Sequence, residues 1–147
     1  MTTLPGVLPF DNGDNSVASH AAWLRGLQAA VFNPLPFTKS YESAQQVITS
    51  GGPLTLAHGL GVQPKLVQTW LHCVIAEHGY SAGDEVLVAG FATDASSNRG
   101  ASVVPDATNI TVRYGNIAGM FLILDKTLGT IQGATNGNWR LIVRAWA

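Results

Sequence analysis

The fold is decided by the stretch at residues 65–76, which reads KLVQTWLHCVIA. One set of side chains recurs at every second position, namely Val67, Thr69, Leu71, Cys73 and Ile75. A period of two is typical of a β-strand, because successive side chains of a strand point to opposite faces. The stretch therefore predicts a strand, the longest of the chain, with these five residues on one face.

Shorter segments with strand character surround this one. They start at Val47 and Ile48 and continue at residues 53–57, 85–89, 101–104, 108–114, 120–124, 130–132 and 138–145, with glycine-rich turns between them. Eight or nine short strands at this spacing predict a mainly β fold, an antiparallel β-sandwich. In the last strand one face would hold Trp139, Leu141, Val143 and Ala145, and the other would hold Arg140, Ile142, Arg144 and Trp146.

The first 36 residues have a different character. Residues 1–15 are rich in Pro, Gly, Asp and Asn, which predicts an extended N-terminal arm. Residues 16–32 predict one short helix, with Asn15 or Ser16 as its N-cap and Asn33-Pro34 as its stop. An apolar stripe on this helix could join helices of several copies, dock on another protein or pack on its own domain. Two domains are expected: residues 1–36 for attachment or oligomerisation, and residues 37–147 as a β-sandwich knob.

Composition excludes several classes of partner. Only 12% of the 147 residues are charged and the net charge is −1, so the chain lacks the basic footprint of nucleic-acid binding. Residues 1–5 have neither the basic nor the apolar region of a signal peptide, and no apolar run approaches membrane-spanning length, so we expect no membrane insertion and synthesis in a cytoplasm. Hydrophobic residues reach 46% and mean hydropathy is +0.19. This apolar surplus favours oligomerisation, because some apolar surface would then be buried between subunits.

One motif is similar to the active-site motif of esterases. Residues 79–83 match the nucleophile-elbow pattern Gly-x-Ser-x-Gly around Ser81, and residues 58–61 resemble an oxyanion loop. A nucleophile elbow must open a helix, yet Ser81 is followed by a turn and a strand. In that fold the catalytic histidine follows the serine, and no histidine follows His78. We therefore expect Ser81 to be a turn residue and the protein not to be an enzyme.

The histidines give little support for a metal site. His58, His72 and His78 could converge, but there is no His-x-His pair, and His72 and Cys73 would point to opposite faces of one strand. We expect His58 to cap its own glycine-rich turn instead. No phosphate loop or dinucleotide fingerprint is present, so we expect no metal and no cofactor.

Three segments in order carry a family resemblance. They are His58-Gly59-Leu60-Gly61 with Pro64-Lys65, then Tyr80-Ser81-Ala82-Gly83-Asp84-Glu85, and finally Asn138-Trp139-Arg140-Leu141 with Arg144-Ala145-Trp146. Together they resemble a small β-domain of tail-fibre, head-fibre and related appendage proteins of tailed bacteriophages, over about residues 41–147. The resemblance implies a homotrimeric structural protein of the virion surface, made in the bacterial host cytoplasm.

Its short length favours a capsid-surface decoration or short head fibre, with phage capsid or tail proteins as partners. The alternative is a tail-fibre or tail-tip module that recognises a host surface glycan. Attachment and oligomerisation would use Trp23, Leu24, Leu27, Val31, Phe32, Phe121, Ile123 and Trp146. A receptor loop would use Phe91, Asp94, Asn98 and Arg99 together with Tyr80 and Tyr114. The segment at 120–124 is apolar on both faces, so it would lie between two layers or meet another subunit.

Overall fold

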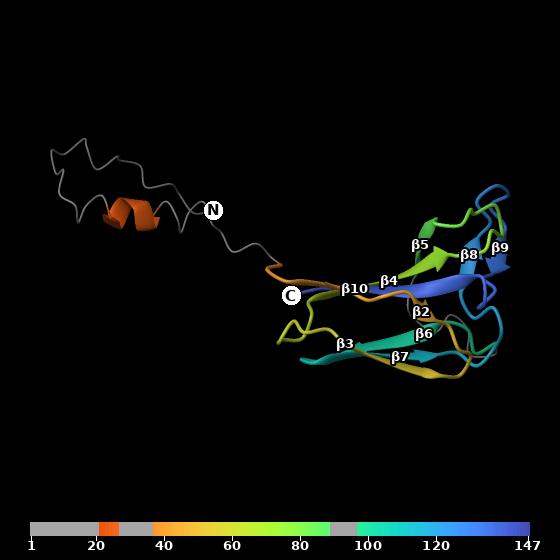
Figure 1. The fold of residues 1–147 in the computed structure, drawn as a ribbon, viewed down its shortest axis with the longest axis horizontal. Coiled ribbons are helices and arrows are strands. Elements are labelled where there is room, and N and C mark those ends of the chain that lie inside the picture. Colours follow the sequence, from red (N-terminus) through yellow and green to blue (C-terminus); the bar gives the residue numbers. More distant parts are fainter. Residues whose placement is uncertain (1–20, 27–36, 89–96) are drawn as a thin grey trace. The chain divides into compact units, whose positions relative to one another are not determined.

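A computed structural model describes residues 21–26, 37–88 and 97–147. The chain divides into two compact units, Met1–Thr38 and Lys39–Ala147. In the first unit, residues 21–26 are helical, which lies within the helix predicted at 16–32. The rest of that helix and the predicted arm lie outside the described residues. The second unit is built from antiparallel strands (Figure 1).

The larger sheet contains the stretch from which the fold was predicted. Its strands are β1 (Ser40–Glu42), β2 (Gln46–Val47), β4 (Leu66–Cys73), β5 (Glu85–Val88) and β10 (Trp139–Trp146). The order is β1-β10-β4-β5, and β2 also pairs with β10. Strands β4 and β10 pair along their whole length, from Trp139 opposite Cys73 to Trp146 opposite Leu66. Because β4 ends at Cys73, Ile75 lies beyond it and is exposed, which corrects the predicted strand end.

The smaller sheet and a separate ribbon complete the second unit. The smaller sheet has the order β3-β7-β6, with β3 at Pro53–Ala57, β7 at Asn109–Tyr114 and β6 at Ala101–Pro105. Strands β8 (Leu122–Leu124) and β9 (Ile131–Gly133) form the ribbon. Figure 1 shows the two sheets face to face with the ribbon toward one end. The predicted mainly β, antiparallel sandwich fold is thereby confirmed.

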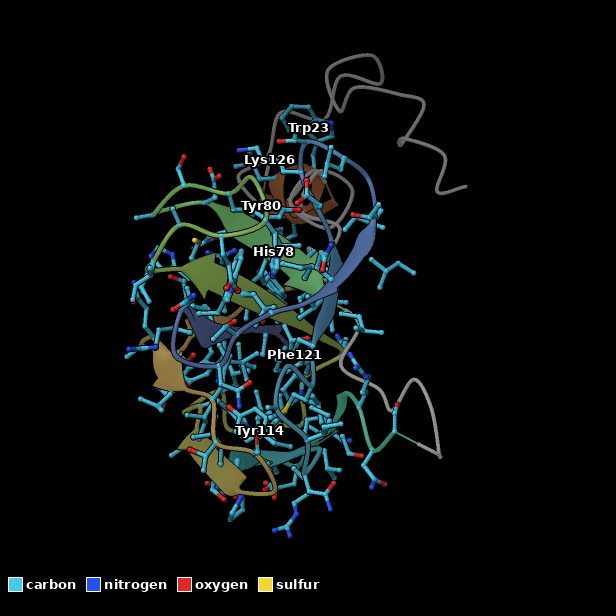
Figure 2. All side chains as sticks on the ribbon, turned by 90° about the vertical axis from the view of Figure 1, so that its right-hand side faces the viewer. Trp23, His78, Tyr80, Tyr114, Phe121 and Lys126 are labelled. Atoms are coloured by element: carbon cyan, nitrogen blue, oxygen red, sulfur yellow. The ribbon has the colours of Figure 1, made fainter. Side chains whose placement is uncertain are left out.

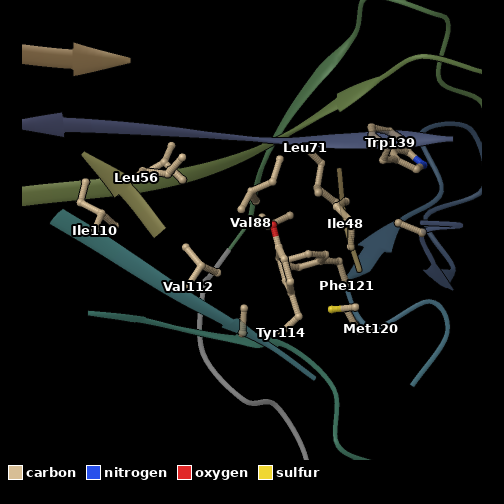
Figure 3. Close-up of a cluster of buried hydrophobic side chains, with 14 of the residues drawn as sticks. Ile48, Leu56, Leu71, Val88, Ile110, Val112, Tyr114, Met120, Phe121 and Trp139 are labelled. Atoms are coloured by element: carbon tan, nitrogen blue, oxygen red, sulfur yellow. The ribbon is translucent and has the colours of Figure 1, made fainter. Parts of the chain in front are cut away.

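The core lies between the two sheets (Figure 3). The larger sheet supplies the face predicted for β10, and Trp139, Leu141, Val143 and Ala145 are all fully buried. Across from them the smaller sheet contributes Leu56, Ile110, Val112 and Tyr114, and the ribbon with the residues just before β8 contributes Met120, Phe121 and Ile123. The alternation of buried and exposed residues follows from the pleat of each strand. The sandwich therefore has one apolar core shared by both sheets and the ribbon.

Two ends of the second unit meet beside β10. The backbone N–H of Lys39 donates to the carbonyl of Ala147 at 3.1 Å, and the N–H of Ala147 donates back to Lys39 at 3.0 Å. Strand β1 then pairs with β10, with Ser40 opposite Trp146. The sequence did not predict β1. This strand has only three residues, which is too short for an alternating pattern to be recognised.

The segment around Phe121 corrects a sequence-based prediction. Phe121 and Ile123 are buried in the chain's own core, and the Phe121 ring packs edge-on against Tyr114 with 6.3 Å between ring centroids. Their placement at a subunit interface was therefore wrong, because their surfaces are already covered. Leu122 and Leu124 are the residues of β8 that face outward.

Candidate functional site

Ser81 lies in a turn that leads into β5. Glycines with positive φ flank it, Gly79 at 76° and Gly83 at 96°. The Ser81 N–H donates to the Asp84 carboxylate at 2.9 Å, and the Asp84 N–H donates back to the Ser81 carbonyl at 3.0 Å. A strand follows this turn, whereas a nucleophile elbow needs a helix. The turn predicted for Ser81 is therefore confirmed.

The three candidate histidines contact different parts of the fold. His72 approaches the Glu85 carboxylate at 3.4 Å, and Nε2 of His78 lies 3.2 Å from the Gly133 carbonyl. His58 is buried at the end of β3. Among the residues that the structure describes, no group of three His, Cys, Asp or Glu side chains gathers as metal ligands would.

His58 closes its own turn, as predicted. Its Nδ1 accepts a hydrogen bond from the Leu60 N–H at 3.1 Å, which leaves the ring proton on Nε2. That nitrogen donates to the Asp106 carbonyl at 3.1 Å. The Asp106 carboxylate in turn accepts hydrogen bonds from the N–H groups of Thr108 and Asn109, which lower the pKa of Asp106. The ring thus joins the turn after β3 to the β6–β7 turn.

A second polar cluster surrounds Glu77, beside the start of β10 at Trp139. Its carboxylate accepts hydrogen bonds from the Thr135 N–H, the Asn138 amide and the Trp139 indole. Burial alone would raise the pKa of Glu77, but these hydrogen bonds outweigh burial and lower it. The cluster joins the β4–β5 connection to the segment before β10, so its role is structural.

Tyr80 belongs to this cluster, so its ring and hydroxyl have partners within the chain, and its predicted receptor role stays a prediction. Its ring packs edge-on against Trp139 at 5.4 Å, and its hydroxyl donates to the Leu124 carbonyl at 2.9 Å. Lys126 lies over the ring and is paired with Asp84 at 2.7 Å (Figure 2). One face of Tyr80 is thus covered by a cation that is itself paired.

The outer face of the larger sheet mixes charge with apolar surface. Arg144 donates to Glu42 at 2.6 Å and to Glu85 at 2.9 Å, and its guanidinium lies 4.9 Å from the centre of the Trp70 ring. These hydrogen bonds outweigh burial and raise the pKa of Arg144. Partly or fully exposed apolar side chains share this face, including Val47, Leu66, Leu87 and Trp146. Trp146 is therefore available for a contact, as its predicted interface role requires.

A separate apolar patch covers the β8–β9 ribbon. Leu124 pairs directly with Ile131, so their side chains lie on the same face. The patch consists of Leu122, Leu124, Leu128 and Ile131, with exposed fractions of 38%, 57%, 73% and 68%. We call these four residues the ribbon patch.

Two hollows flank Arg99 at the end of the sandwich where β10 begins. One has a volume of about 350 Å³ and is lined by Gly51, Asn98, Arg99, Gly100, Ala101, Ser102, Arg113, Tyr114, Gly115 and Asn116. The other has a volume of about 450 Å³ and is lined by Arg99, Ala118, Gly119, Gly133, Thr135, Asn136 and Gly137. We call them the strand hollow and the ribbon hollow. Arg99 lines both, and its guanidinium donates to the Gly119 carbonyl at 3.3 Å.

Glycines make room for this arrangement. A Cβ on Gly115 would lie 2.1 Å from the carbonyl oxygen of Asn98, and the Gly115 N–H donates to the Gly100 carbonyl at 2.9 Å. A Cβ on Gly133 would lie 3.2 Å from the Gly119 carbonyl oxygen and 3.6 Å from the Arg99 guanidinium. The chain segments that form the hollows therefore approach closely enough that side chains at these positions would push them apart.

The structure brings together only part of the predicted receptor site. Asn98 is exposed and lies with Arg99 at the hollows. Tyr114 also borders the strand hollow, but it is only 3% exposed and its ring belongs to the core (Figure 3), so its role as an exposed receptor aromatic was wrong. Phe91 and Asp94 lie outside the described residues.

Of the predicted attachment residues in the helix, the structure describes only two. Trp23 is half-buried and Leu24 is 54% exposed within residues 21–26. Leu27, Val31 and Phe32 lie outside the described residues, so their roles stay predictions.

Sequence analysis missed Arg113, Asn116 and Asn136 at the hollows, because no local pattern shows that these separated segments meet. The run of glycines at 115, 119, 133 and 137 was the one available signal of close backbone approach.

Comparison with known proteins adds no family to this geometry. The sequence matches no protein-family model and no curated protein. No helix among residues 21–26, 37–88 and 97–147 is long and apolar enough to cross a bilayer.

Proposed function

We propose that the protein is a non-enzymatic structural component of a tailed-phage virion. It would be a homotrimeric capsid-surface decoration or short head fibre, made in the host cytoplasm and exposed on the particle. Its partners would be its own copies and phage capsid or tail proteins, without nucleic acid, membrane insertion or cofactor. The sequence resemblance motivates the phage assignment and the trimer.

The ribbon patch is the observation that carries the oligomeric part of this proposal. Four aliphatic side chains are exposed on one ribbon, and full burial of an exposed aliphatic side chain is worth about 1.5–3 kcal/mol, so covering each of these partly exposed side chains would contribute part of that. Exposed apolar side chains gathered on one face mark interaction sites on soluble proteins, and Leu122, Leu124 and Ile131 share one face of the ribbon. The corrected core also supports this choice, because Phe121 and Ile123 point inward while Leu122 and Leu124 remain uncovered.

Solution mass tests the oligomer directly. The wild-type protein should form a trimer at micromolar concentration by light scattering, and Leu124→Asp with Ile131→Asp should shift it toward monomer. Val104→Asp is the matched control, because Val104 is 61% exposed on the outer face of the smaller sheet. A monomeric wild-type protein would refute the oligomeric proposal before any variant is made.

Particle binding tests the virion assignment. The purified protein should bind phage capsids that lack it and increase their resistance to heat. No binding to capsids or tails would contradict the assignment.

The hollows at Arg99 favour a second candidate, a receptor-binding module that recognises a host surface glycan. Their walls carry amide, hydroxyl and guanidinium groups, which suit the hydroxyls of a sugar. In this case the purified protein would adhere to host cells and block infection by the phage. Failure of the wild-type protein to adhere would remove this candidate.

A further inference from the structure

The end of the sandwich at Arg99 carries positive charge that the described carboxylates leave unpaired. Arg99 and Arg113 both line the strand hollow. The six carboxylates in the described residues are engaged elsewhere: Glu42 and Glu85 with Arg144, Asp84 with Lys126, Glu77 with Trp139, and Asp106 and Asp125 with turn N–H groups. An anionic ligand in the strand hollow would therefore lie beside two arginines without competition from these carboxylates.

Arg99 is held in place while most of its donors remain available. Its side chain is half-buried, and Nη1 donates to the Gly119 carbonyl. A guanidinium has five N–H donors in a fixed fork that matches a carboxylate. Since one bond orients the group, less side-chain freedom is lost when a ligand binds.

Arg113 approaches the strand hollow from the smaller sheet. It lies on β7 directly opposite Ser102 of β6, and both side chains are exposed on the outer face. Arg99 comes instead from the loop before β6. Two elements thus each contribute an arginine to the lining of one hollow.

The rest of the lining indicates what the anion is attached to. Asn98, Ser102 and Asn116 in the strand hollow, and Thr135 and Asn136 in the ribbon hollow, offer amide and hydroxyl groups. The glycines between them expose backbone, and Tyr114 leaves almost no aromatic surface for stacking a base. Neighbouring hollows that share one residue suit a chain of linked polar units better than a single compact ion.

We infer that the two hollows flanking Arg99 bind an acidic saccharide, with a sugar carboxylate between Arg99 and Arg113 and an adjoining sugar unit in the ribbon hollow. This inference rests on the second candidate function and names its ligand class. It involves only residues 51, 98–102, 113–119 and 133–137, which the structure describes.

Binding to defined oligosaccharides tests the inference. The probes are trigalacturonate, a sialic acid trimer and a hyaluronan hexasaccharide, and the neutral control is fully methyl-esterified trigalacturonate. Calorimetry should detect binding of at least one acidic probe, and esterification should weaken trigalacturonate binding about tenfold or more where that probe binds. The inference is overturned if no acidic probe binds at millimolar concentration or if the ester binds as tightly as the acid.

Variants locate the site. Arg99→Gln should weaken binding of the acidic probe about tenfold or more, and Arg113→Gln should weaken it by a smaller factor. Lys126→Gln is the control, because it removes one half-exposed positive charge from the same unit and Lys126 lines neither hollow. Should Arg99→Gln prove unfolded by thermal melting, the exposed Arg113→Gln decides the outcome. Unchanged affinity in a folded Arg99→Gln variant would overturn the inference.

Two further arms separate the alternatives. Inorganic phosphate that competes at the same concentration as the saccharide would show a general anion site and overturn the saccharide assignment.

Cell adhesion distinguishes the inference from the function on which it rests. If the wild-type protein adheres to host cells and the Arg99→Gln and Arg113→Gln variants adhere equally, the site is wrong and the receptor function stands. If acidic saccharides bind at Arg99 but the protein does not adhere, the receptor function fails and the site stands.

Discussion

At the scale of single residues, the loops of this protein depend on a few well-placed hydrogen-bond acceptors. Glu77 accepts hydrogen bonds from Thr135 and Asn138, which are distant in sequence, whereas the ring of His58 accepts from the nearby Leu60 N–H and donates to the distant Asp106 carbonyl. The carboxylates of Asp106 and Asp125 accept hydrogen bonds from backbone N–H groups within their own turns. Because such donors would otherwise be left without partners on folding, these acceptors stabilise the connections between strands.

The first prediction concerns Glu77. Glu77→Gln should lower the free energy of unfolding by about 2–3 kcal/mol at pH 7, because a neutral amide replaces a carboxylate that accepts from Thr135, Asn138 and Trp139. The folded-state pKa of Glu77 is lowered, so its contribution is present above the unfolded value and is lost as pH falls through the folded value. The difference between wild type and variant should therefore shrink in acid. Urea denaturation at several pH values measures this.

Glu42→Gln serves as the control for Glu77. The Glu42 side chain is 59% exposed, so its pair with Arg144 should contribute within about 1 kcal/mol. Equal losses of stability in the two variants would contradict the central role given to Glu77.

The second prediction concerns Tyr114, whose hydroxyl is buried without a hydrogen-bond partner. Desolvation raises its pKa to about 12. Since an unfolded tyrosine ionises near pH 10, folding stability should fall by about 2–3 kcal/mol as pH rises from 10 to 12. Tyr114→Phe should be equally or more stable at pH 7 and should lose less stability over this alkaline range. Denaturant titration of both proteins checks this.

Tyr80→Phe is the matched control for Tyr114→Phe. The Tyr80 hydroxyl donates to Leu124, so its removal should cost about 1 kcal/mol at pH 7. A larger loss for Tyr114→Phe than for Tyr80→Phe would show that the Tyr114 hydroxyl does have a partner.

At the scale of elements, the strands are regular but their connections are crowded where the hollows form. The end of β7 passes against the chain just before β6, with Gly115 hydrogen-bonded to Gly100. This close approach shapes the strand hollow and holds Arg99 beside it.

The third prediction tests this crossing. Gly115→Ala should lower the free energy of unfolding by more than about 2 kcal/mol, because its Cβ would lie 2.1 Å from a backbone oxygen of Asn98. Gly137→Ala is the control within the ribbon hollow, since nothing lies within 4 Å of the added Cβ. Thermal melting should separate the two variants, and a neutral Gly115→Ala would refute the close approach.

The strands show what sequence periodicity can and cannot predict. The alternation in β10 assigned Trp139, Leu141, Val143 and Ala145 to the core correctly, because burial on one face imposes a period of two. The same logic failed at Phe121 and Ile123, where both faces of the segment are apolar and the pattern does not identify the inner one. Arg99 was predicted only as a loop residue, and Arg113 was missed because its place at the same hollow depends on the pairing of β6 with β7.

At the scale of the whole molecule, the unit Lys39–Ala147 contains the complete described core. All the strands of both sheets and of the ribbon lie within it. It should therefore fold without the residues that precede it.

The fourth prediction follows from this division. Deletion of residues 1–36 should leave the melting temperature of the β-domain unchanged within a few degrees, because no core residue is removed. On the proposed function, the truncated protein should fail to incorporate into particles, since the predicted attachment residues are lost. Calorimetry measures the first outcome and particle occupancy the second. Wild-type occupancy of the truncated protein would show that attachment lies elsewhere.

The mutual hydrogen bonds between Lys39 and Ala147 have a practical consequence. Because these two residues are adjacent, a short peptide can join them in a protein without residues 1–38. The chain can then be opened elsewhere, which gives a circular permutant. The β8–β9 turn at Gly129 is a suitable opening, since nothing lies within 4 Å of a Cβ built there. Strand β10 spans about 25 Å between this junction and the end with the hollows. Such a permutant would carry new termini in the turn of the ribbon patch, where a fluorescent label could report directly on contacts between neighbouring copies.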